Sequence, residues 1–217
     1  MVRASLLFFI FWTQPLLASD YLQSAVRVNE GSASCGTIIK VERDRVWVIS
    51  TGHMEKRNEP VVEVFYRDGK KLSKPLKSKG KIVLRVENNV DFGIDFSLIE
   101  VGFGDFDHRR AFKGVTIGDA KKDTDCISIG CDLAVEPTEY RVKVEEICKG
   151  RGDIYTVGKD RTNGGRSGGG LFYDGKLVAV SWGATVSGDE KGIFTSGQSI
   201  KQVLTACGYG RLLEAEK

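Results

Sequence analysis

Short runs of β-forming residues, each ended by turn-forming residues, recur from about residue 25 to the C-terminal region. Arg43-Asp44 and Asp174-Gly175 stand between pairs of such runs, where hairpin turns are expected. The chain holds 26 glycines but only 4 prolines, and few stretches have helical periodicity. Because glycine supplies the backbone conformations that tight turns need, this pattern predicts an all-β fold.

The predicted strands form two sets, separated by a stretch rich in glycine and aspartate at residues 102–110. The first set comprises residues 25–28, 36–41, 45–49, 61–66, 82–86 and 96–101. The second set comprises residues 112–117, 125–129, 140–147, 154–157, 170–173, 177–182 and 192–195. Strand spacing alone is compatible with a sandwich or with barrels. Two groups joined by a linker favour two barrels side by side, at residues 20–107 and 108–217.

A single short helix is expected near the C-terminus. Its evidence is a set of residues at helical spacing, followed by Gly208 as a stop signal. The residues at this spacing are Ser199, Gln202, Val203 and Ala206.

The first 19 residues have the pattern of a signal peptide. Arg3 precedes an apolar run at residues 4–12, and the small pair Ala18-Ser19 follows before polar Asp20. The apolar run is shorter than the roughly 20 residues that a membrane-spanning helix needs. We therefore expect export, to the periplasm or out of the cell, with an uncleaved anchor or a buried N-terminal helix as the alternatives.

Five cysteines are present: Cys35, Cys126, Cys131, Cys148 and Cys207. An exported protein can oxidise its cysteines, and the odd count leaves at least one unpaired. We expect a disulfide between two of Cys126, Cys131 and Cys148, which are close in sequence. A zinc site is less favoured, because the Cys126–Cys131 spacing is not that of a structural ligand pair and no histidine is adjacent.

A loop rich in glycine surrounds Ser167, in the run Asn-Gly-Gly-Arg-Ser-Gly-Gly-Gly-Leu-Phe at residues 163–172. Such a loop can bend sharply and aim two backbone N–H groups at one point, as an oxyanion hole requires. A flexible loop or a phosphate-binding nest is the alternative reading. A Walker-type phosphate loop is excluded, because no lysine precedes Ser167.

Three motifs together resemble those of the trypsin-like (chymotrypsin-fold) serine proteases, in the family's order of histidine, aspartate and serine. Val-Ile-Ser-Thr-Gly-His ends at His53, Asp-Phe-Ser-Leu-Ile begins at Asp95, and Gly-Arg-Ser-Gly-Gly-Gly-Leu surrounds Ser167. One departure is Gly170, where the family usually has proline. The only other histidine, His108, lies in the charged linker with no motif around it.

The resemblance covers residues 25–206 and implies two packed six-stranded antiparallel Greek-key β-barrels with a short C-terminal helix. It also implies an endopeptidase in which Ser167 is the nucleophile, His53 the general base and Asp95 the residue that orients the histidine. The backbone N–H groups of Gly165 and Ser167 would form the oxyanion hole. No metal or cofactor is implied.

Further positions resemble the family's substrate-binding residues. Ser181-Trp182-Gly183 is similar to the edge strand that pairs with the substrate backbone, and Gly192 begins a segment similar to the far wall of the specificity pocket. An aromatic core strand is the plainer reading of the same residues. Arg161 stands at the family's pocket-floor position, which would favour an acidic side chain in the substrate; a solvated surface arginine is the alternative.

Arg166 stands where zymogen-activated members carry an aspartate that pairs with a new N-terminal amine. The resemblance therefore implies that no cleaved N-terminus inserts beside this site. We expect protein or peptide as the substrate, a monomer, and no stable membrane insertion after signal cleavage.

A nucleic-acid partner is not expected. The net charge is only +3, and the basic run at residues 70–81 has no aromatic residues interleaved, so a solvated loop is the simpler interpretation.

Other functions remain open from the sequence. A catalytically inactive trypsin-like domain that binds peptides or proteins is the main alternative, and a β-rich binding domain with coincidental motifs is another. An α/β-hydrolase is excluded, because that fold needs a histidine after its serine and none follows Ser167.

Overall fold

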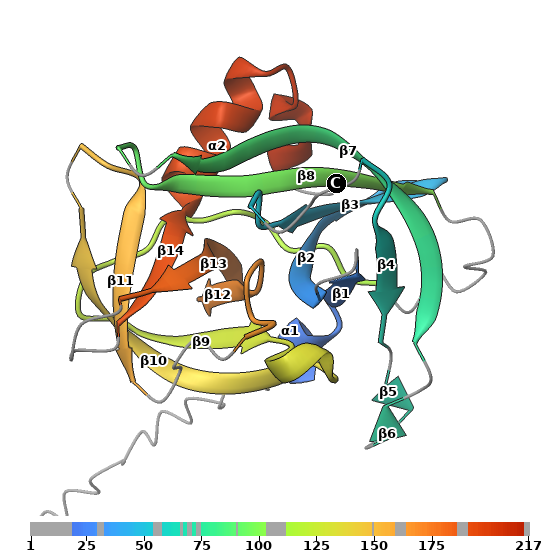
Figure 1. Ribbon diagram of the computed structural model, residues 1–217, viewed down its shortest axis with the longest axis horizontal. Helices are drawn as coiled ribbons and strands as arrows, with labels where there is room; N and C mark the ends of the chain where they lie inside the picture. The colour runs from blue at the N-terminus through green and yellow to red at the C-terminus, as the bar shows by residue number, and fades with distance from the viewer. Residues whose placement is uncertain are drawn as a thin grey trace, which may run out of the picture.

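The computed structural model describes residues 19–29, 33–53, 58–65, 67–68, 71–72, 75–89, 91–102, 112–148, 150–158, 164–185 and 191–214. Within this part of the chain, two closed six-stranded antiparallel barrels lie side by side (Figure 1). The predicted all-β fold of two barrels with a short C-terminal helix is confirmed. The predicted signal peptide lies outside the described residues, apart from Ser19. Among the described helices, none is long and apolar enough to cross a membrane.

The first barrel has the strand order β1-β2-β3-β8-β7-β4. Its strands are β1 (Ala25–Asn29), β2 (Ala33–Val41), β3 (Arg45–Ser50), β4 (Val61–Val64), β7 (Leu76–Asn89) and β8 (Ile94–Gly102). A separate two-stranded hairpin, β5 (Arg67–Asp68) and β6 (Lys71–Leu72), lies between β4 and β7 in the chain.

Alternating side chains explain why β3 is buried on both faces. Val46 and Val48 point into the interior of the first barrel, whereas Trp47 and Ile49 pack in the seam between the barrels. A strand that covers two cores at once is almost continuously apolar, and β3 has this composition.

The second barrel has the order β10-β11-β14-β13-β12-β9. Its strands are β9 (Asp125–Gly130), β10 (Thr138–Ile147), β11 (Asp153–Gly158), β12 (Gly170–Tyr173), β13 (Lys176–Ala184) and β14 (Gly192–Ser196). The predicted Asp174-Gly175 turn joins β12 to β13, with φ of 49° and 76° at its two residues. These positive φ values match the type I′ hairpin turn that Asp-Gly favours.

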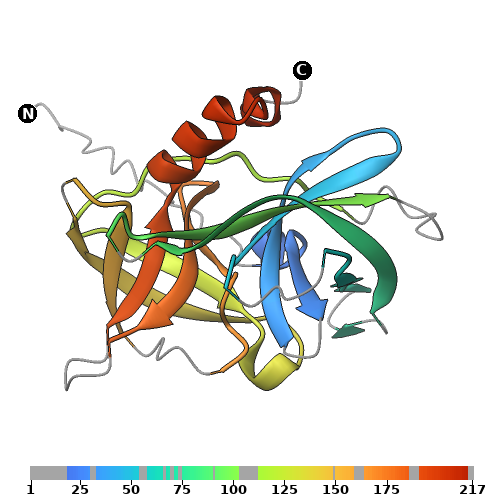
Figure 2. The same ribbon diagram turned by 45° about the horizontal axis from the view of Figure 1, so that its top comes forward.

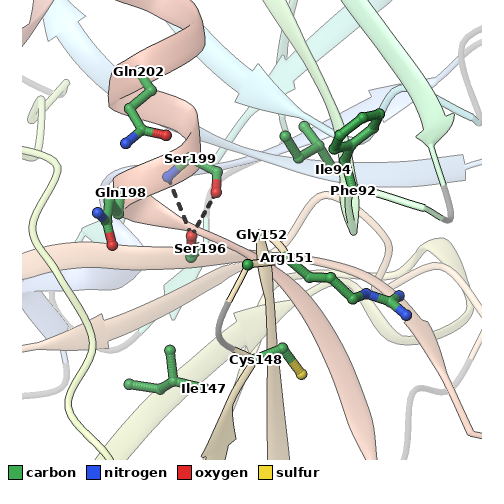
Figure 3. A pocket seen from close by; sticks show the side chains of 11 residues that line it. Phe92, Ile94, Ile147, Cys148, Arg151, Gly152, Ser196, Gln198, Ser199 and Gln202 are labelled. Atoms are coloured by element: carbon green, nitrogen blue, oxygen red, sulfur yellow. Dashed lines mark hydrogen bonds between the residues drawn. The ribbon is translucent and has the colours of Figure 1, made fainter.

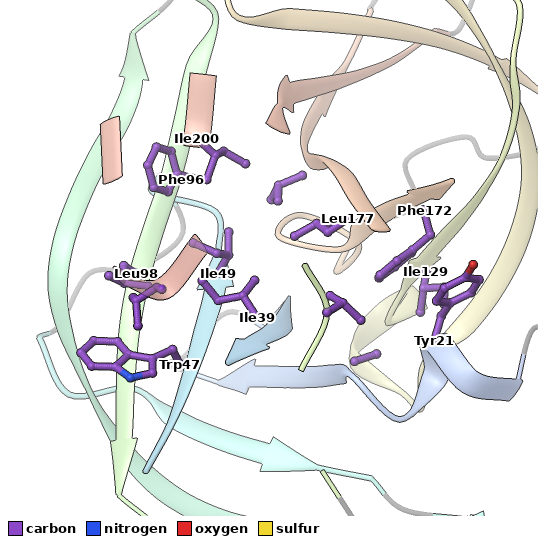
Figure 4. Close-up of a cluster of buried hydrophobic side chains, with 14 of the residues drawn as sticks. Tyr21, Ile39, Trp47, Ile49, Phe96, Leu98, Ile129, Phe172, Leu177 and Ile200 are labelled. Atoms are coloured by element: carbon purple, nitrogen blue, oxygen red, sulfur yellow. The ribbon is translucent and has the colours of Figure 1, made fainter. Parts of the chain in front are cut away.

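A shared core fills the seam between the barrels (Figure 4). Phe96 and Leu98 enter it from the first barrel, Phe172 and Leu177 from the second, and Ile200 from the C-terminal helix. Burial of large apolar side chains from all three parts holds the barrels in a fixed relation. Any site built from both barrels is therefore supported by a packed interior.

Within the described residues, three short helices and one longer one complete the fold. Helix α1 (Ser19–Leu22) precedes β1, and the 3₁₀ helices η2 (Asp132–Ala134) and η3 (Gly210–Leu213) follow β9 and α2. Helix α2 (Gly197–Ala206) lies on the outside of the barrels (Figure 2). Ser196 caps its N-terminus, where its side chain accepts the Ser199 N–H, and the helix ends before Gly208 at φ 84°.

Two predictions about secondary structure were wrong. Residues 112–117 form no strand beyond a single bridge between Ile117 and Leu177. Val115 N–H donates to Ile38 O of the first barrel, whereas Leu177 N–H donates to Thr116 O from the second. Because the segment makes its hydrogen bonds to two different barrels, it forms no continuous strand pairing with either.

The basic run at residues 70–81 is also no simple loop, because β7 begins at Leu76. Lys77, Lys79 and Lys81 are exposed while Gly80 between them is buried. This alternation with a period of two is the signature of a strand with one solvated face. The predicted boundary between residues 107 and 108 lies outside the described residues, in the connection between the two barrels.

Candidate active site

Asp95 is fully buried at the start of β8 and lies beside His53, which follows β3. The distance between His53 Nδ1 and Asp95 Oδ1 is 3.1 Å. The same carboxylate oxygen accepts the backbone N–H groups of Gly52 at 2.7 Å and His53 at 3.3 Å. A buried carboxylate is costly unless it is hydrogen-bonded, and these donors meet that requirement.

Thr51 completes this arrangement. Its hydroxyl donates to Asp95 Oδ1 at 2.5 Å and lies 2.8 Å from His53 Nδ1. An ionised carboxylate only accepts hydrogen bonds, and the threonine proton is already used, so Nδ1 must carry the ring proton. Nε2 is then unprotonated in the neutral ring and free to accept a proton. The His53 side chain is 28% exposed, so the ring is partly accessible to solvent.

The backbone of Asp95 is also held from the second barrel. Thr195 Oγ1 on β14 accepts the Asp95 N–H at 2.9 Å and donates to the Asp95 carbonyl at 3.1 Å. The position of the carboxylate is therefore fixed by both barrels.

Ser167 lies at the seam, on the loop before β12. Its carbonyl accepts the N–H of Cys35 on β2 at 2.7 Å, and the next residue, Gly168, donates its N–H to Ser181 O at 2.7 Å. Gly168 has φ 87°, and a Cβ there would lie 2.0 Å from Cys35 O and 2.9 Å from Thr51 N. The loop therefore reaches the Thr51–His53 segment only because residue 168 is glycine.

Ser167 and His53 do not contact each other through a hydrogen bond in the described residues. Such contacts are often long in the absence of substrate and shorten in the complex.

The two expected oxyanion donors are available. Within the described residues, neither the N–H of Gly165 nor that of Ser167 donates a hydrogen bond. Gly165 has φ 100°, and its carbonyl is turned the other way, where it accepts the thiol of Cys35 at 3.2 Å. Two unpaired N–H groups two residues apart on one turn are suited to bind an oxyanion.

Arg166 lies between these donors and points into the protein, where only 1% of it is exposed. Its guanidinium lies over the Tyr140 ring, 4.5 Å from the centroid. At 3.0 to 3.3 Å it donates hydrogen bonds to the carbonyl oxygens of Ser128 and Gly130, the hydroxyls of Ser128 and Thr138, and Asp132 Oδ1.

Asp132 is the negative partner of Arg166. Its other oxygen accepts the hydroxyls of Tyr140 at 2.7 Å and Thr138 at 3.0 Å. Burial alone would raise the pKa of Asp132, but the Tyr140 hydrogen bond and the charge of Arg166 outweigh it, so the pKa lies below its ordinary value. The buried arginine is thus compensated within the second barrel.

The expected substrate-binding residues lie on β13 and β14. The pairing of β13 with β14 shifts register between Ser181 and Gly183, so Trp182 sits at a bulge. A Cβ at Gly183 would meet nothing closer than Ile193 Cδ1 at 4.0 Å, whereas one at Gly192 would lie 2.8 Å from Thr156 Oγ1. Within the described residues, Gly183 therefore has no close neighbour, and Gly192 is required by close packing. Arg161 lies outside the described residues.

A cavity of about 410 Å³ opens at a different place, between the start of β8, the loop after β10 and the start of α2 (Figure 3). Phe92, Ile147, Cys148, Arg151 and Gln202 are among its lining residues. It contains none of the three predicted catalytic residues. We therefore treat it as separate from the active site.

Sequence reasoning missed several residues that shape the site. Thr51 was visible inside the histidine motif, and a hydroxyl two residues before the histidine was the available signal. Asp132 and Cys35 gave no signal, because each meets the serine loop only through the tertiary fold. No disulfide joins any of the five cysteines in the structure, so the expected bond among Cys126, Cys131 and Cys148 is absent.

No protein-family model matches the chain, and no curated protein matches its sequence. Solved structures do match its shape. The inactivated protease paralogue S-D1 of the scabies mite is 15% identical, with a TM-score of 0.65, over 86% of this chain and 93% of its own.

The protease Rv3671c of M. tuberculosis is 18% identical in both of its forms. The inactive form has a TM-score of 0.65 over 88% of this chain and 91% of its own. The active form has a TM-score of 0.64 over 88% and 83%. These neighbours include an inactivated protein, so the fold alone does not decide activity. The chain has the two-barrel fold of the trypsin-like (chymotrypsin-fold) proteases.

Proposed function

We propose that the protein is a secreted serine endopeptidase whose catalytic triad is His53, Asp95 and Ser167. The observation that carries this proposal is the hydrogen-bonded His53–Asp95 pair, at 3.1 Å, beside a serine loop with unpaired N–H groups at Gly165 and Ser167. A base, its orienting acid and two oxyanion donors are the parts that acyl transfer to a serine requires.

In the proposed mechanism, Ser167 Oγ attacks the scissile carbonyl while His53 Nε2 takes its proton. His53 then gives this proton to the leaving amine, and a water molecule hydrolyses the acyl-enzyme by the same route. Asp95 holds the ring with its proton on Nδ1 and stabilises the imidazolium. The oxyanion binds to the N–H groups of Gly165 and Ser167, and each such donor is worth about 3–4 kcal/mol in the transition state.

Arg166 supports a site that needs no inserted N-terminus. Its guanidinium is already paired with Asp132 at 3.2 Å within the second barrel. An incoming N-terminal amine carries the same charge as Arg166 and would find no partner there. We therefore propose that the serine loop is held by this internal ion pair from the time the protein folds.

The bulge at Trp182 supports substrate binding along β13. A residue that leaves the ladder with β14 can offer its backbone groups to an extended peptide, which would add a strand at this edge. Arg161 is proposed to select an acidic side chain of the substrate. Protein or peptide is the proposed substrate, a monomer the proposed state, and export by residues 1–19 the proposed route.

The proposal is tested with a fluorophosphonate probe, which reacts only with activated serines. The purified protein and a Ser167→Ala variant are treated, and the labelled residue is mapped by mass spectrometry. We expect labelling at Ser167 that is absent from the variant. His53→Ala should fold normally and lose labelling, because the serine then has no base.

A folded protein without labelling at Ser167 contradicts the proposal. The alternative is then a catalytically inactive trypsin-like domain that binds peptides or proteins. The missing Ser167–His53 hydrogen bond in the described residues and the likeness to an inactivated paralogue favour this alternative. Retained binding of extended peptides by the Ser167→Ala variant does not separate the two, so turnover and labelling decide.

A further inference from the structure

Two buried cysteines from different barrels meet behind the serine loop. Cys35 lies on β2 of the first barrel and Cys131 directly follows β9 of the second. Their exposed fractions are 1% and 0%. Neither has a role in the proposed mechanism. The two cysteines are 96 residues apart in the chain, so only the fold brings them together.

The backbone of Cys131 is in direct contact with the side chain of Cys35. The N–H of Cys131 donates to the sulfur of Cys35 at 2.5 Å. The Cys131 sulfur lies 3.9 Å from Val26 O, and formation of a disulfide requires it to turn about χ1 toward the Cys35 sulfur. Burial raises the pKa of the Cys35 thiol, and the neighbouring Cys131 side chain raises it further.

The two cysteines lie next to the residues that hold the serine loop in place. Cys35 binds the serine loop at two points, through its N–H to Ser167 O and through its thiol to Gly165 O. Cys131 is the residue between Gly130 and Asp132, both of which accept hydrogen bonds from Arg166. A bond between the two sulfurs would therefore join β2 to the segment after β9. Both of these segments make hydrogen bonds to residues 165–167.

We propose that Cys35 and Cys131 form a disulfide that links the two barrels when the protein folds in an oxidising environment. Each thiol gives up its proton, and the pair loses two electrons as the sulfur–sulfur bond forms. A low-molecular-weight disulfide, such as oxidised glutathione, takes up the two electrons and two protons and becomes two thiols. This proposal does not depend on the proposed protease activity.

The other three cysteines are not placed to compete. Cys126 lies in the interior of the second barrel, where burial raises the pKa of its thiol to about 11. Cys148 lines the separate cavity, and Cys207 is exposed at the end of α2. None of them makes a hydrogen bond to another cysteine within the described residues.

Full burial decides when the bond can form. A thiol with a raised pKa and no exposure reacts slowly, so the folded reduced protein should resist oxidation. Oxidation therefore accompanies folding, before the barrels close around the pair. Once formed, the bond closes a loop of nearly 100 residues, a length for which the loss of chain entropy in the unfolded state is large.

The first test maps the bond. The full chain is unfolded with reductant, refolded in a mixture of reduced and oxidised glutathione, alkylated in denaturant, digested and analysed by mass spectrometry without reduction. We expect a linked peptide pair containing Cys35 and Cys131, with two hydrogens lost. Alkylation of both residues in the refolded protein, or a bond from either one to a different cysteine, overturns the proposal.

The second test measures stability in wild type, Cys131→Ser and Cys207→Ser, the last a control with the same number of thiols. Reductant should lower the unfolding temperature of wild type and Cys207→Ser by on the order of 10 °C. It should not move that of Cys131→Ser. Equal sensitivity of all three proteins refutes the proposal, and if Cys131→Ser does not fold, the mapped wild type decides alone.

Discussion

The ion pair behind the serine loop makes Asp132→Asn an informative change. Asp132 Oδ1 lies 3.2 Å from Arg166 Nη1, and the two side chains are 16% and 2% exposed. The variant keeps an oxygen for Arg166 and loses only the negative charge. The guanidinium then stays buried without the charge of Asp132.

The expected cost follows from that burial. Removing one partner of a buried pair typically costs 3–5 kcal/mol, because the remaining charge has left water without compensation. The asparagine oxygen retains part of the hydrogen bonding, so we expect about 3 kcal/mol of unfolding free energy to be lost at pH 7. For a chain of this length, this corresponds to a fall in the unfolding temperature of about 6–12 °C.

The effect should depend on pH in a defined direction. Because the folded-state pKa of Asp132 is lowered, its contribution to stability is present above its unfolded pKa of about 3.9 and is lost as the pH falls through the lower folded value. The stability difference between wild type and Asp132→Asn should therefore be largest near neutral pH. It should shrink below about pH 4.

Urea unfolding at pH 7 and at acidic pH measures both expectations. Asp123→Asn is the matched control, since Asp123 pairs with Lys143 at 3.5 Å on the surface and is 66% exposed. We expect the control to cost less than about 0.5 kcal/mol. The reasoning is refuted if Asp132→Asn costs no more than the control, or if the difference grows as the pH falls.

The serine loop should respond to the same change. Arg166 stands between the two oxyanion donors, so loss of the Asp132 charge should weaken the contacts that hold its guanidinium and let Gly165 and Ser167 turn out of position. We expect probe labelling at Ser167 to slow by about tenfold or more, equivalent to about 1.4 kcal/mol. In a double-mutant cycle, Asp132→Asn with Arg166→Gln should cost less than the sum of the two single changes.

Three further predictions address the site. Asp95→Asn should lower kcat on peptide substrates by about 10⁴-fold, because the His53 ring loses the partner that fixes its proton on Nδ1. Asp91→Asn, on the exposed turn before β8, is the control and should leave kcat unchanged. Equal losses in the two variants would contradict the assignment of Asp95 as the residue that orients His53. Gly168→Ala should reduce the unfolding free energy, measured in urea, by about 2–4 kcal/mol. Gly168 has φ 87°, and a Cβ there would lie 2.0 Å from the carbonyl oxygen of Cys35. Gly164→Ala is the control and should change stability little, because a Cβ there would meet none of the described residues within 4 Å. Wild type should cleave after glutamate in preference to lysine or arginine in a peptide library, and Arg161→Asp should reverse this order; efficient wild-type cleavage after lysine would show that Arg161 does not face the pocket.

Local sequence patterns were enough to predict most strands. Alternating apolar residues and turn pairs such as Asp174-Gly175 act over a few residues, so their signal survives without knowledge of the fold. The same reasoning failed at residues 112–117, where an apolar stretch bridges the two barrels and so cannot extend a ladder in either. The sequence pattern also predicted a loop at the start of β7. The high charge of its lysines hid the fact that they occupy alternate positions, as on one face of a strand.

The sequence by itself determined the order of the histidine, aspartate and serine motifs, and their resemblance to the trypsin-like proteases predicted the two-barrel fold. His53 and Asp95 were recognised because the residues around each are neighbours in the chain. Only the tertiary structure decided which distant residues complete the site. Asp132 under Arg166, and Cys131 against Cys35, come together because barrel closure and strand register set their distance. Alternation fixes which face of a strand a residue occupies, and it carries no information about which strand of the other barrel that face will meet.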